Sequence, residues 1–472
     1  MDKHLILSNE TSDPLYYYIF CYIFKSMINP TKIMKRTSIL LFLLSGLSIV
    51  VLRAQEFNPS RMDSLMSAMD KKNAWMGSIA IAKGDKLLYQ KAIGYADRAQ
   101  QKLATTNTRY GIGSISKTFT ATLVLKTIEL GKLQMNQALS TFYKDIPNAD
   151  KITIRQLLDH SSGVHSVTDD KDYLTWNTKA QTEKELVERM IKGGAEFDPG
   201  SKHEYSNSNY ILLTYILEKV WKKDYAFLLN QQICQPLKLE QTTFGRPQNI
   251  AKDVSESYRF TQDWDLEPHT DNSVPLGAGA IWSTPTDLVK FFNGLFNHKL
   301  INSTSLEEMK KIIGGYGLGL FQMPFYDRRG FGHTGGIDGY SSVASHFDDG
   351  NYNVALISNG NNYNNNEILK FSFGELYQKP FPLPDLSEIQ LTDEETTSIL
   401  GEYKSEQPPI QINITKDDGK ILGQVVGQPA FQLKPKDKNT LVQLQYGVKI
   451  VFDRSENKMT LYQNGQTLIL KK

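Results

Sequence analysis

The sequence predicts an α+β domain, built on an antiparallel sheet with an inserted helical region, followed by a small all-β barrel domain. Alternating apolar and polar residues, which indicate strands, occur near the start of the chain at 76–82 and 87–94 and again at 317–359. The segment from 114 to about 239 has mostly helical spacing, and a sheet assembled from such distant segments is typical of the α+β class. Beyond a stiff proline-rich connection at 379–384, six short alternating runs predict the barrel.

Each predicted element has its own sequence signal. The two runs near the start flank Lys83-Gly-Asp85, which predicts a hairpin. A helix is predicted from Ser114 to about 130, because glycines precede it, apolar residues recur at helical spacing and Gly131 follows. Another helix is predicted to open at 283–287, where Ser and Thr can cap it and proline fits the first turn, and to run through Phe296.

The remaining elements follow from the same periodicities. Two loop-rich stretches, 160–176 and 196–209, interrupt the helical region, and a last helix is predicted at 367–377. The other predicted strands are 317–323, 330–335, 340–347 and 352–359 in the first domain and 411–415, 421–426, 440–445, 449–452, 459–463 and 467–470 in the second.

The N-terminal segment is typical of an exported protein. Basic residues in Met34-Lys-Arg-Thr-Ser precede a short apolar run at 39–52 and then Arg53-Ala-Gln55, which predicts a signal peptide at 34–54. The apolar run is short for a membrane span, so we expect a periplasmic or secreted protein with no stable span after signal cleavage. For residues 1–33, which precede this signal, two explanations stay open: a start codon assigned too early, or a genuine extension that touches a membrane.

Composition bounds the number of domains and excludes some function classes. With 472 residues, of which 40% are hydrophobic, the chain can form two domains, predicted at 55–380 and 381–472. The net charge is only +2 and the basic residues are not clustered, so no nucleic-acid partner is expected. Cys21 precedes the predicted cut, and Cys234, which has no evident base beside it, is interpreted as a packing residue.

Ser114-x-x-Lys117 at the start of a predicted helix is the first candidate for chemistry. Unpaired backbone N–H groups and the positive end of the helix dipole favour an oxyanion near Ser114. Lys117 lies one turn along the same face, which is the arrangement of a nucleophile beside its base, provided that burial lowers the pKa of the lysine. The spacing alone is a weak signal, because Ser455 and Lys458 repeat it in a polar turn and a helix-capping serine would also fit.

Two further clusters have the chemistry that such a nucleophile needs. Tyr205-x-Asn207 lies in a loop before a predicted helix, where the phenol can exchange protons with Ser114 and the amide can orient Lys117 or a substrate carbonyl; a buried structural tyrosine is the alternative. His333-Thr334-Gly335-Gly336 lies on a predicted strand, where glycines allow a ligand to approach the backbone N–H groups.

Taken together, these motifs resemble the serine β-lactamase and penicillin-binding-protein superfamily, in the class C β-lactamase-like branch called peptidase family S12. The resemblance covers about 67–377 and has the three motifs in the family's order. Three further stretches look like family landmarks; they are Leu157-Leu-Asp-His-Ser-Ser-Gly163, Phe197-x-Pro-Gly200 and Gly277-Ala-Gly-Ala-Ile-Trp-Ser-Thr-Pro-Thr-Asp287. The strands after 381 resemble the lipocalin-like domain that follows some S12 catalytic domains.

The resemblance implies a role for each motif residue. Ser114 would be the acylated nucleophile, Lys117 its activating base and Tyr205 the general acid/base partner. Asn207 would orient substrate and lysine, and the backbone N–H groups of Ser114 and Gly336 would form the oxyanion hole. His333, Thr334 and Gly335 would complete the substrate-binding strand. The reaction would need no metal or organic cofactor, and the partners would be small molecules or peptides, cell-wall fragments among them.

One departure from the family pattern bears on the substrate. β-Lactamases of this branch carry lysine where this chain has His333, and a largely neutral histidine suits a substrate carboxylate less well than a permanent cation does. Histidine here is similar to D-aminopeptidases and other S12 peptidases, which favours an exported peptidase or esterase. The alternatives are a penicillin-binding sensor with slow deacylation, a β-lactamase, and a structural protein that acts through its C-terminal domain.

Overall fold

The computed structural model describes residues 57–247, 253–261, 263–463 and 465–472. The predicted signal peptide at 34–54 and the extension at 1–33 lie outside these residues. None of the helices in the described ranges is long and apolar enough to cross a membrane.

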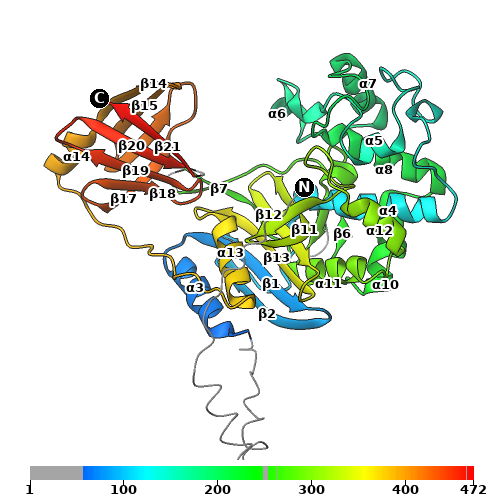
Figure 1. The fold of residues 1–472 in the computed structure, drawn as a ribbon, viewed down its shortest axis with the longest axis horizontal. Coiled ribbons are helices and arrows are strands. Elements are labelled where there is room, and N and C mark those ends of the chain that lie inside the picture. The colour runs from blue at the N-terminus through cyan, green and yellow to red at the C-terminus, as the bar shows by residue number, and fades with distance from the viewer. Residues whose placement is uncertain (1–56, 248–252, 262, 464) are drawn as a thin grey trace, which may run out of the picture. The chain divides into compact units, whose positions relative to one another are not determined.

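A six-stranded antiparallel sheet confirms the α+β class and the assembly of the sheet from distant segments. Its order is β10-β11-β12-β13-β1-β2, so that strands from the start of the domain join strands from its end (Figure 1). The junction is the pairing of β1 with β13, in which Ile79 lies opposite Leu356. The strands are β1 (Trp75–Lys83), β2 (Lys86–Ile93), β10 (Phe321–Phe325), β11 (Arg328–Ile337), β12 (Tyr340–Phe347) and β13 (Tyr352–Asn361).

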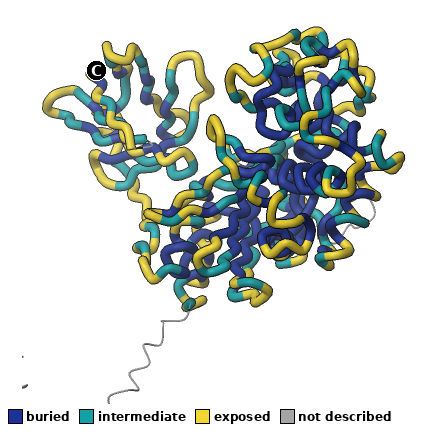
Figure 2. The backbone as a smooth tube through the Cα atoms, turned by 45° about the vertical axis from the view of Figure 1, so that its right-hand side comes forward, coloured by how far each residue is buried: buried dark blue, intermediate teal, exposed yellow. Residues whose placement is uncertain are grey.

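Both faces of this sheet are covered, because alternate residues of β1 belong to different cores. Ile79 and Ile81 pack in a cluster with residues of α3 (Pro59–Lys71) and α13 (Asn365–Leu376). Ala80 and Ala82 belong instead to the larger cluster, which contains α11 (Pro285–Phe296) and the helical region. In Figure 2 the central strands are dark blue, the colour of buried residues. A central strand buried on both sides explains why β1 is apolar along nearly its whole length.

The inserted helical region is organised around α4 (Ser116–Glu129). Every residue of α4 from Ser116 to Leu125 is buried, so this part of the helix has no polar, solvent-facing side. It contacts α8 (Asn207–Trp221), whose residues from Ser208 to Leu217 are also buried. Around these two helices the region contains α5 (Ile154–Leu158), α6 (Tyr173–Trp176), α7 (Glu183–Gly193), α9 (Tyr225–Leu229), α10 (Gln235–Leu237) and α12 (Ser303–Lys310).

The second domain is a closed barrel of eight antiparallel strands, which confirms the prediction of an all-β barrel. Six strands were predicted, and the structure adds β14 (Gly401–Glu406) and β17 (Phe431–Asp437). Each of these two strands buries a single residue, Tyr403 and Leu433 respectively, and therefore shows too little apolar alternation to be recognised. The predicted boundary at 380/381 falls in the segment between α13 and α14 (Asp393–Ile399), which has no helix or strand.

The barrel closes through the pairing of its first and last strands, where Lys404 lies opposite Lys471. The other six strands are β15 (Pro409–Asp417), β16 (Lys420–Val425), β18 (Thr440–Gln443), β19 (Val448–Asp453), β20 (Lys458–Gln463) and β21 (Gln466–Lys471). Its interior is filled by a separate apolar cluster that includes Ile412, Ile450 and Met459. Closure leaves no strand edge unpaired, which is the usual protection of an all-β module against aggregation.

Candidate active site

Ser114 lies in a short 3₁₀ turn, Gly113–Ile115, directly before α4 and not in the first α-helical turn as predicted. Gly113 has φ +50°, and a Cβ built on it would lie 2.8 Å from the backbone N of Gly336 on β11. The turn therefore packs on β11 so closely that only glycine fits at this position. As a result Ser114 lies between the N-terminus of α4 and β11, and its side chain is partly exposed.

Lys117 is fully buried and its amine contacts three oxygens. The Nζ lies 3.1 Å from Ser114 Oγ, 2.8 Å from Asn207 Oδ1 and 2.8 Å from the Ala278 carbonyl oxygen. The two carbonyl-type oxygens can only accept hydrogen bonds. A neutral amine has two N–H donors for them and one lone pair, which is then left for the Ser114 hydroxyl. This geometry fits a lysine that receives a proton from Ser114.

Burial lowers the pKa of Lys117 well below its ordinary value of 10.5. No carboxylate in the described part of the chain forms an ion pair with its Nζ, so nothing with full negative charge offsets the loss of hydration. Its other close neighbours are the rings of Tyr205 and Tyr210, at 4.8 and 5.7 Å from Nζ to the ring centroids. The requirement set by the sequence, a desolvated lysine, is met because α4 is buried from Ser116 to Leu125.

Tyr205 completes a chain of proton donors and acceptors at Ser114. Its hydroxyl donates to Ser114 Oγ at 2.8 Å, and burial raises its pKa above the ordinary value of 10.0, so the phenol keeps its proton near neutral pH. The chain then runs from Tyr205 O–H to Ser114 Oγ and from Ser114 O–H to Lys117 Nζ. Tyr205 is thus placed to give a proton to the leaving atom of a substrate that Ser114 attacks.

Asn207 holds Lys117 from the start of α8. Its Oδ1 accepts from Lys117, and its Nδ2 donates to Thr168 Oγ1 at 2.9 Å, which orients the amide oxygen toward the lysine. Thr168 and Ala278 were not identified from the sequence as site residues. Ala278 lies inside the landmark at 277–287, which carried no assigned role, and Thr168 lies in the loop-rich stretch at 160–176, where no periodic pattern distinguishes it.

His160, in the landmark at 157–163, is a third residue whose place in the site was not predicted. Its carbonyl accepts from Glu204 N–H at 2.9 Å and its Nδ1 accepts from Ser206 N–H at 3.1 Å, so it holds the chain on both sides of Tyr205. Its ring centroid lies 4.5 Å from that of Tyr205 and 5.1 Å from that of Tyr316. Burial, Lys117 and His333 lower the pKa of His160 well below 6.5, so it is neutral.

The structure places His333 in the interior and not on the open face of β11. Its side chain is 2% exposed, its ring centroid lies 4.3 Å from that of Phe321, and its Nδ1 donates to the Thr334 carbonyl oxygen at 2.5 Å. Burial and the nearby Lys117 lower the pKa of His333 to about 3, so it carries no charge for a substrate carboxylate. Thr334, the next residue, is exposed because successive side chains of a strand point to opposite faces.

The open edge of β11 runs past Ser114. The edge strand β10 pairs with β11 only as far as Gly332, so residues 333–337 have no partner in β10. Gly336 is exposed in this stretch and adjoins the Ser114 turn at Gly113. An unpaired strand edge offers backbone N–H and C=O groups to an extended substrate. This stretch brings the backbone N of Gly336, which with that of Ser114 was predicted to form the oxyanion hole, beside the Ser114 turn.

Gly335 and Gly336 form a matched pair for a test of this packing. A Cβ at Gly335 would lie 2.1 Å from the Ile112 carbonyl oxygen and 2.4 Å from Ser342 Oγ, which are hydrogen-bonded to each other. Gly335→Ala is therefore expected to cost about 2–3 kcal/mol of stability, as overpacking of a rigid site does. Gly336→Ala meets nothing within 4 Å and should leave the thermal midpoint nearly unchanged. Thermal unfolding of both variants checks this, and equal midpoints would contradict it.

The chain is similar to known proteins over most of its length. A family model described as Beta-lactamase matches residues 63–376. "Penicillin-binding protein 4*" of Bacillus subtilis (strain 168) is 24% identical over 442 residues, which are 86% of this chain and 96% of that protein. "Teichoic acid D-alanine hydrolase" of Staphylococcus aureus (strain NCTC 8325 / PS 47) is 28% identical over 297 residues, 59% of this chain and 73% of that protein. The fold is also that of the octameric penicillin-binding protein homologue from Pyrococcus abyssi, with TM-score 0.63, 23% identity and coverage of 88% of this chain and 100% of that one.

Proposed function

The chain belongs to the beta-lactamase family and is a serine hydrolase, and from this premise we propose that it acts through an acyl-enzyme on Ser114. The observation that carries the proposal is the contact of Ser114 Oγ with both Lys117 Nζ at 3.1 Å and the Tyr205 hydroxyl at 2.8 Å. A serine that contacts a buried amine of lowered pKa and a protonated phenol has its base and its acid in place before substrate binds.

The proposed acylation step uses each group once. Ser114 Oγ attacks the substrate carbonyl carbon while its proton passes to Lys117 Nζ, and the negative charge that forms on the carbonyl oxygen is held by Ser114 N–H and Gly336 N–H. Tyr205 donates its proton to the leaving nitrogen or oxygen as the carbonyl bond to it breaks, and the phenol is reprotonated from the lysine. Water then attacks the ester on Ser114, with the same groups acting in reverse to release the acid.

The substrates that this site favours are amides or esters of small peptides and related compounds. His333 and His160 are neutral, and Lys117 is directed at Ser114, so none of these three described side chains offers a permanent cation to a terminal carboxylate. This supports a D-amino-acid peptidase or an esterase over a carboxypeptidase. The relative named as a teichoic acid D-alanine hydrolase is consistent with this class. The signal-peptide pattern at 34–54 supports action outside the cytoplasm, in the periplasm or medium.

A penicillin-binding protein with slow deacylation is the second candidate function. It needs the same acylation groups, and the similarity to the Bacillus subtilis protein named penicillin-binding protein 4*, which covers 86% of this chain, favours it. The two functions differ only in the rate at which water removes the acyl group from Ser114. That rate is a measurable quantity and separates them directly.

The test is intact-mass detection of a covalent adduct on the full chain, with a fluorophosphonate and a penicillin in parallel and Ser114→Ala as the control. We expect one adduct on the wild type with the fluorophosphonate and none on the variant. Loss of the penicillin adduct within minutes indicates a hydrolase, whereas an adduct that persists for hours indicates the binding protein. A folded wild type that neither reagent labels would overturn the proposed function.

A further inference from the structure

The segment 163–170 lies against the start of α8 and holds Asn207 at two points. Ser166 Oγ accepts from the backbone N–H of Asn207 at 3.3 Å, and Thr168 Oγ1 accepts from its side-chain Nδ2 at 2.9 Å. The two hydroxyl oxygens lie 2.9 Å apart and can hydrogen-bond to each other. Because the Asn207 amide in turn binds Lys117, the orientation of the catalytic lysine depends on where this segment lies.

His165 ties this segment to the part of the chain that leads to Tyr205. Its Nδ1 lies 2.6 Å from Glu196 Oε1, and its Nε2 lies 2.9 Å from Asp170 Oδ1. The backbone N–H of Glu196 also donates to the Gly163 carbonyl oxygen at 2.9 Å. The His165 side chain is 14% exposed, so the ring is largely shielded from water.

These two contacts determine the charge of His165. An ionised carboxylate can only accept a hydrogen bond, so each ring nitrogen must carry a hydrogen to bind one. A neutral imidazole has one N–H, whereas an imidazolium has two. The ring can therefore bind Glu196 and Asp170 at the same time only when it is protonated.

The end of α7 favours a positive charge at the same place. A Cβ built on Gly193, the last residue of α7, would lie 2.2 Å from two carbons of the His165 ring, so the ring packs directly on the helix terminus. The C-terminus of a helix is the negative end of its dipole, which stabilises a protonated histidine. The helix end therefore both sets the place of the ring and favours its charged form.

The charged groups around His165 come from its own segment, from α7 and from the chain after α7. They are Asp169 and Asp170, Arg189, and Glu196. Burial lowers the pKa of His165, but its hydrogen bonds with Glu196 and Asp170 outweigh burial and raise that pKa above the ordinary value of 6.5. Arg189 binds the other oxygen of Asp170 at 3.2 Å, which fixes this carboxylate and offsets part of its charge.

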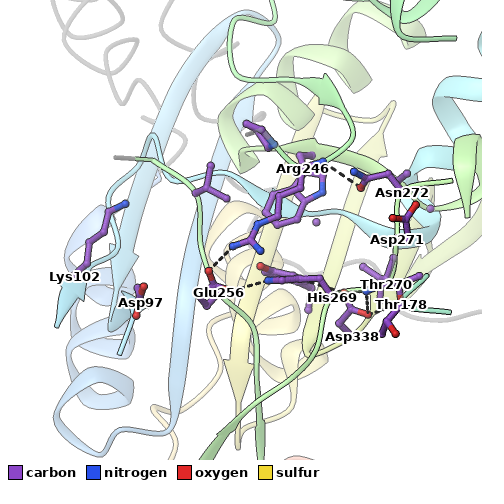
Figure 3. Close-up of a pocket in the computed structure, with 18 of the residues that line it drawn as sticks. Asp97, Lys102, Thr178, Arg246, Glu256, His269, Thr270, Asp271, Asn272 and Asp338 are labelled. Carbon is purple, nitrogen blue, oxygen red and sulfur yellow. Dashed lines mark hydrogen bonds and ion pairs between the residues drawn. The ribbon is translucent and has the colours of Figure 1, made fainter. Parts of the chain in front are cut away.

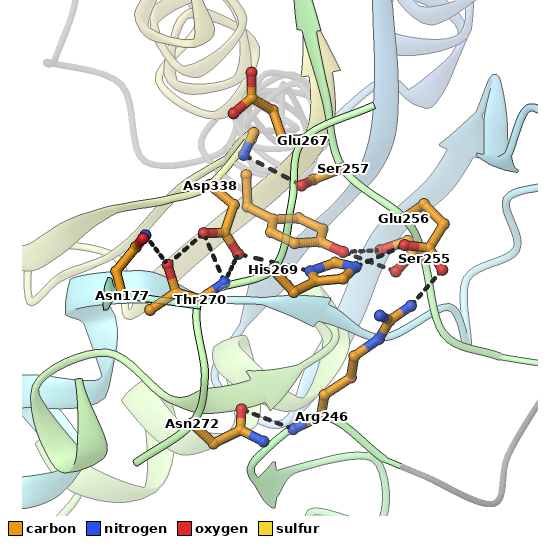
Figure 4. A network of polar contacts seen from close by, with 12 residues as sticks. Asn177, Arg246, Ser255, Glu256, Ser257, Glu267, His269, Thr270, Asn272 and Asp338 are labelled. Atoms are coloured by element: carbon orange, nitrogen blue, oxygen red, sulfur yellow. Dashed lines mark hydrogen bonds and ion pairs between the residues drawn. The ribbon is translucent and has the colours of Figure 1, made fainter. Parts of the chain in front are cut away.

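A second histidine lies between two carboxylates, and its geometry is different. His269 is in the wall of a polar cavity of about 520 Å³ (Figure 3), where its Nε2 lies 2.6 Å from a Glu256 oxygen (Figure 4). Its Nδ1 lies 3.6 Å from Asp338 Oδ2, too far for a hydrogen bond, and has no hydrogen-bond partner among the described residues. Glu256 also forms an ion pair with Arg246 in the same wall. One N–H is enough for the contacts of His269, so of these two histidines only His165 requires both.

We propose that His165, in its protonated form, is a positioning residue of the catalytic centre. It fixes Thr168, and through Thr168 it holds the Asn207 amide in the orientation that binds Lys117. When His165 loses its proton, one of its two carboxylate contacts is lost and Thr168 is held less firmly, so acylation of Ser114 slows. This inference rests on the proposed function, because it assumes that Lys117 activates Ser114.

The test measures the rate of fluorophosphonate adduct formation on Ser114 across a range of pH, with the full-length wild type and His165→Asn. Asparagine keeps an N–H donor near the position of Nδ1 but does not titrate. The ratio of the two rates removes the contribution of Lys117, because both proteins share it. We expect the wild type to be about three- to tenfold faster at low pH, in the range of couplings between contacting residues, and the ratio to fall toward one as pH rises through the pKa of His165.

A ratio that does not change with pH overturns the proposal, because a merely structural role of the ring would lower the rate equally at every pH. A matched control is His298→Asn, which removes an exposed histidine in the turn after α11. Its ratio to the wild type should stay near one throughout.

Thr168→Val tests the route by which His165 acts. Valine keeps the shape of the side chain and removes the hydroxyl that binds the Asn207 amide. When Thr168→Val is present, adding His165→Asn should change the rate little at any pH, because the connection to Asn207 is already broken. A pH-dependent ratio that persists between these two proteins shows that His165 acts by another route, and the proposal fails.

The charge of His165 can be measured directly by NMR of the histidine ring nitrogens, with His165→Asn to identify the signal. We expect both nitrogens to stay protonated at a pH where exposed His298 has become neutral. The protonated ring also stabilises the fold below about pH 6.5, and this stabilisation is lost as pH rises through the raised pKa of the folded protein. The wild type should therefore exceed His165→Asn in thermal midpoint by more at about pH 6 than at about pH 9. A His165 that titrates below His298 overturns the proposal.

The same labelling separates failure of this inference from failure of the proposed function. A wild type that is labelled on Ser114, with a ratio to His165→Asn that is independent of pH, disproves the positioning role and leaves Ser114 as a nucleophile. A wild type that is not labelled at all disproves the proposed function, and the positioning role with it.

Discussion

Lys117→Met is expected to lower the rate of Ser114 acylation by about 10³-fold, within the range that positioned general bases contribute. Methionine keeps the length and the apolar stem of the buried side chain but has no amine to take the Ser114 proton. The rate of fluorophosphonate adduct formation measures the effect, with a thermal melt to show that the variant is folded. Lys126→Met is the matched control, because Lys126 lies on the same helix and its Nζ donates to the Gln232 carbonyl oxygen at 3.1 Å, which is not part of the candidate active site. Equal labelling of wild type and Lys117→Met would exclude Lys117 as the base.

The pH dependence of the wild type tests the same assignment. The active form of Lys117 is the neutral amine, so activity is present above its pKa and is lost as pH falls through it. Because burial places that pKa well below 10.5, the rise of kcat/KM with pH should be complete well before the pH at which an exposed lysine loses its proton. A profile that still rises through pH 10 would show that the base is an ordinary lysine, or that another group is the base.

Tyr205→Phe is expected to have the second largest effect, and its size should depend on the leaving group. The hydroxyl that contacts Ser114 Oγ at 2.8 Å is lost, while the ring and its packing against His160 are kept. Hydrolysis of an alkyl amide, whose nitrogen must be protonated to leave, should fall by about 10²-fold or more. Hydrolysis of a p-nitrophenyl ester, whose phenolate leaves without a proton, should fall much less.

A neighbouring tyrosine provides the control for that substitution. Tyr316 belongs to the same aromatic group, with its ring centroid 6.2 Å from that of Tyr205, so Tyr316→Phe tests the loss of a hydroxyl beside the site. It should leave the ratio of amide to ester rates unchanged. If Tyr205→Phe slows both substrates equally, the phenol positions Ser114 and does not protonate the leaving group.

Much of this site follows from local sequence. Ser114 and Lys117 are one helical turn apart, so local helical geometry brings them together. The glycines before Ser114 indicated only the start of the helix, and the close approach of Gly113 to Gly336 was seen only in the structure. The sheet and the barrel class followed from apolar alternation, since each strand must bury one face. The strands β14 and β17 were not predicted, because each of them buries only one residue.

Other features were decided only by the tertiary structure, because they depend on groups far apart in the chain. The low pKa of Lys117 follows from its burial by surrounding segments, among them the one that carries Ala278, 161 residues away. The sequence placed His333 on a strand, but its direction into the core depends on which face of β11 is covered. The cavity wall joins Arg246, Glu256, His269 and Asp338, which share no short motif. The sequence by itself determines which chemical groups are available and how they are spaced along one helix or strand. The hydration of each side chain and its contacts with distant residues exist only in the folded chain, and they decide its charge state and the specificity of the site.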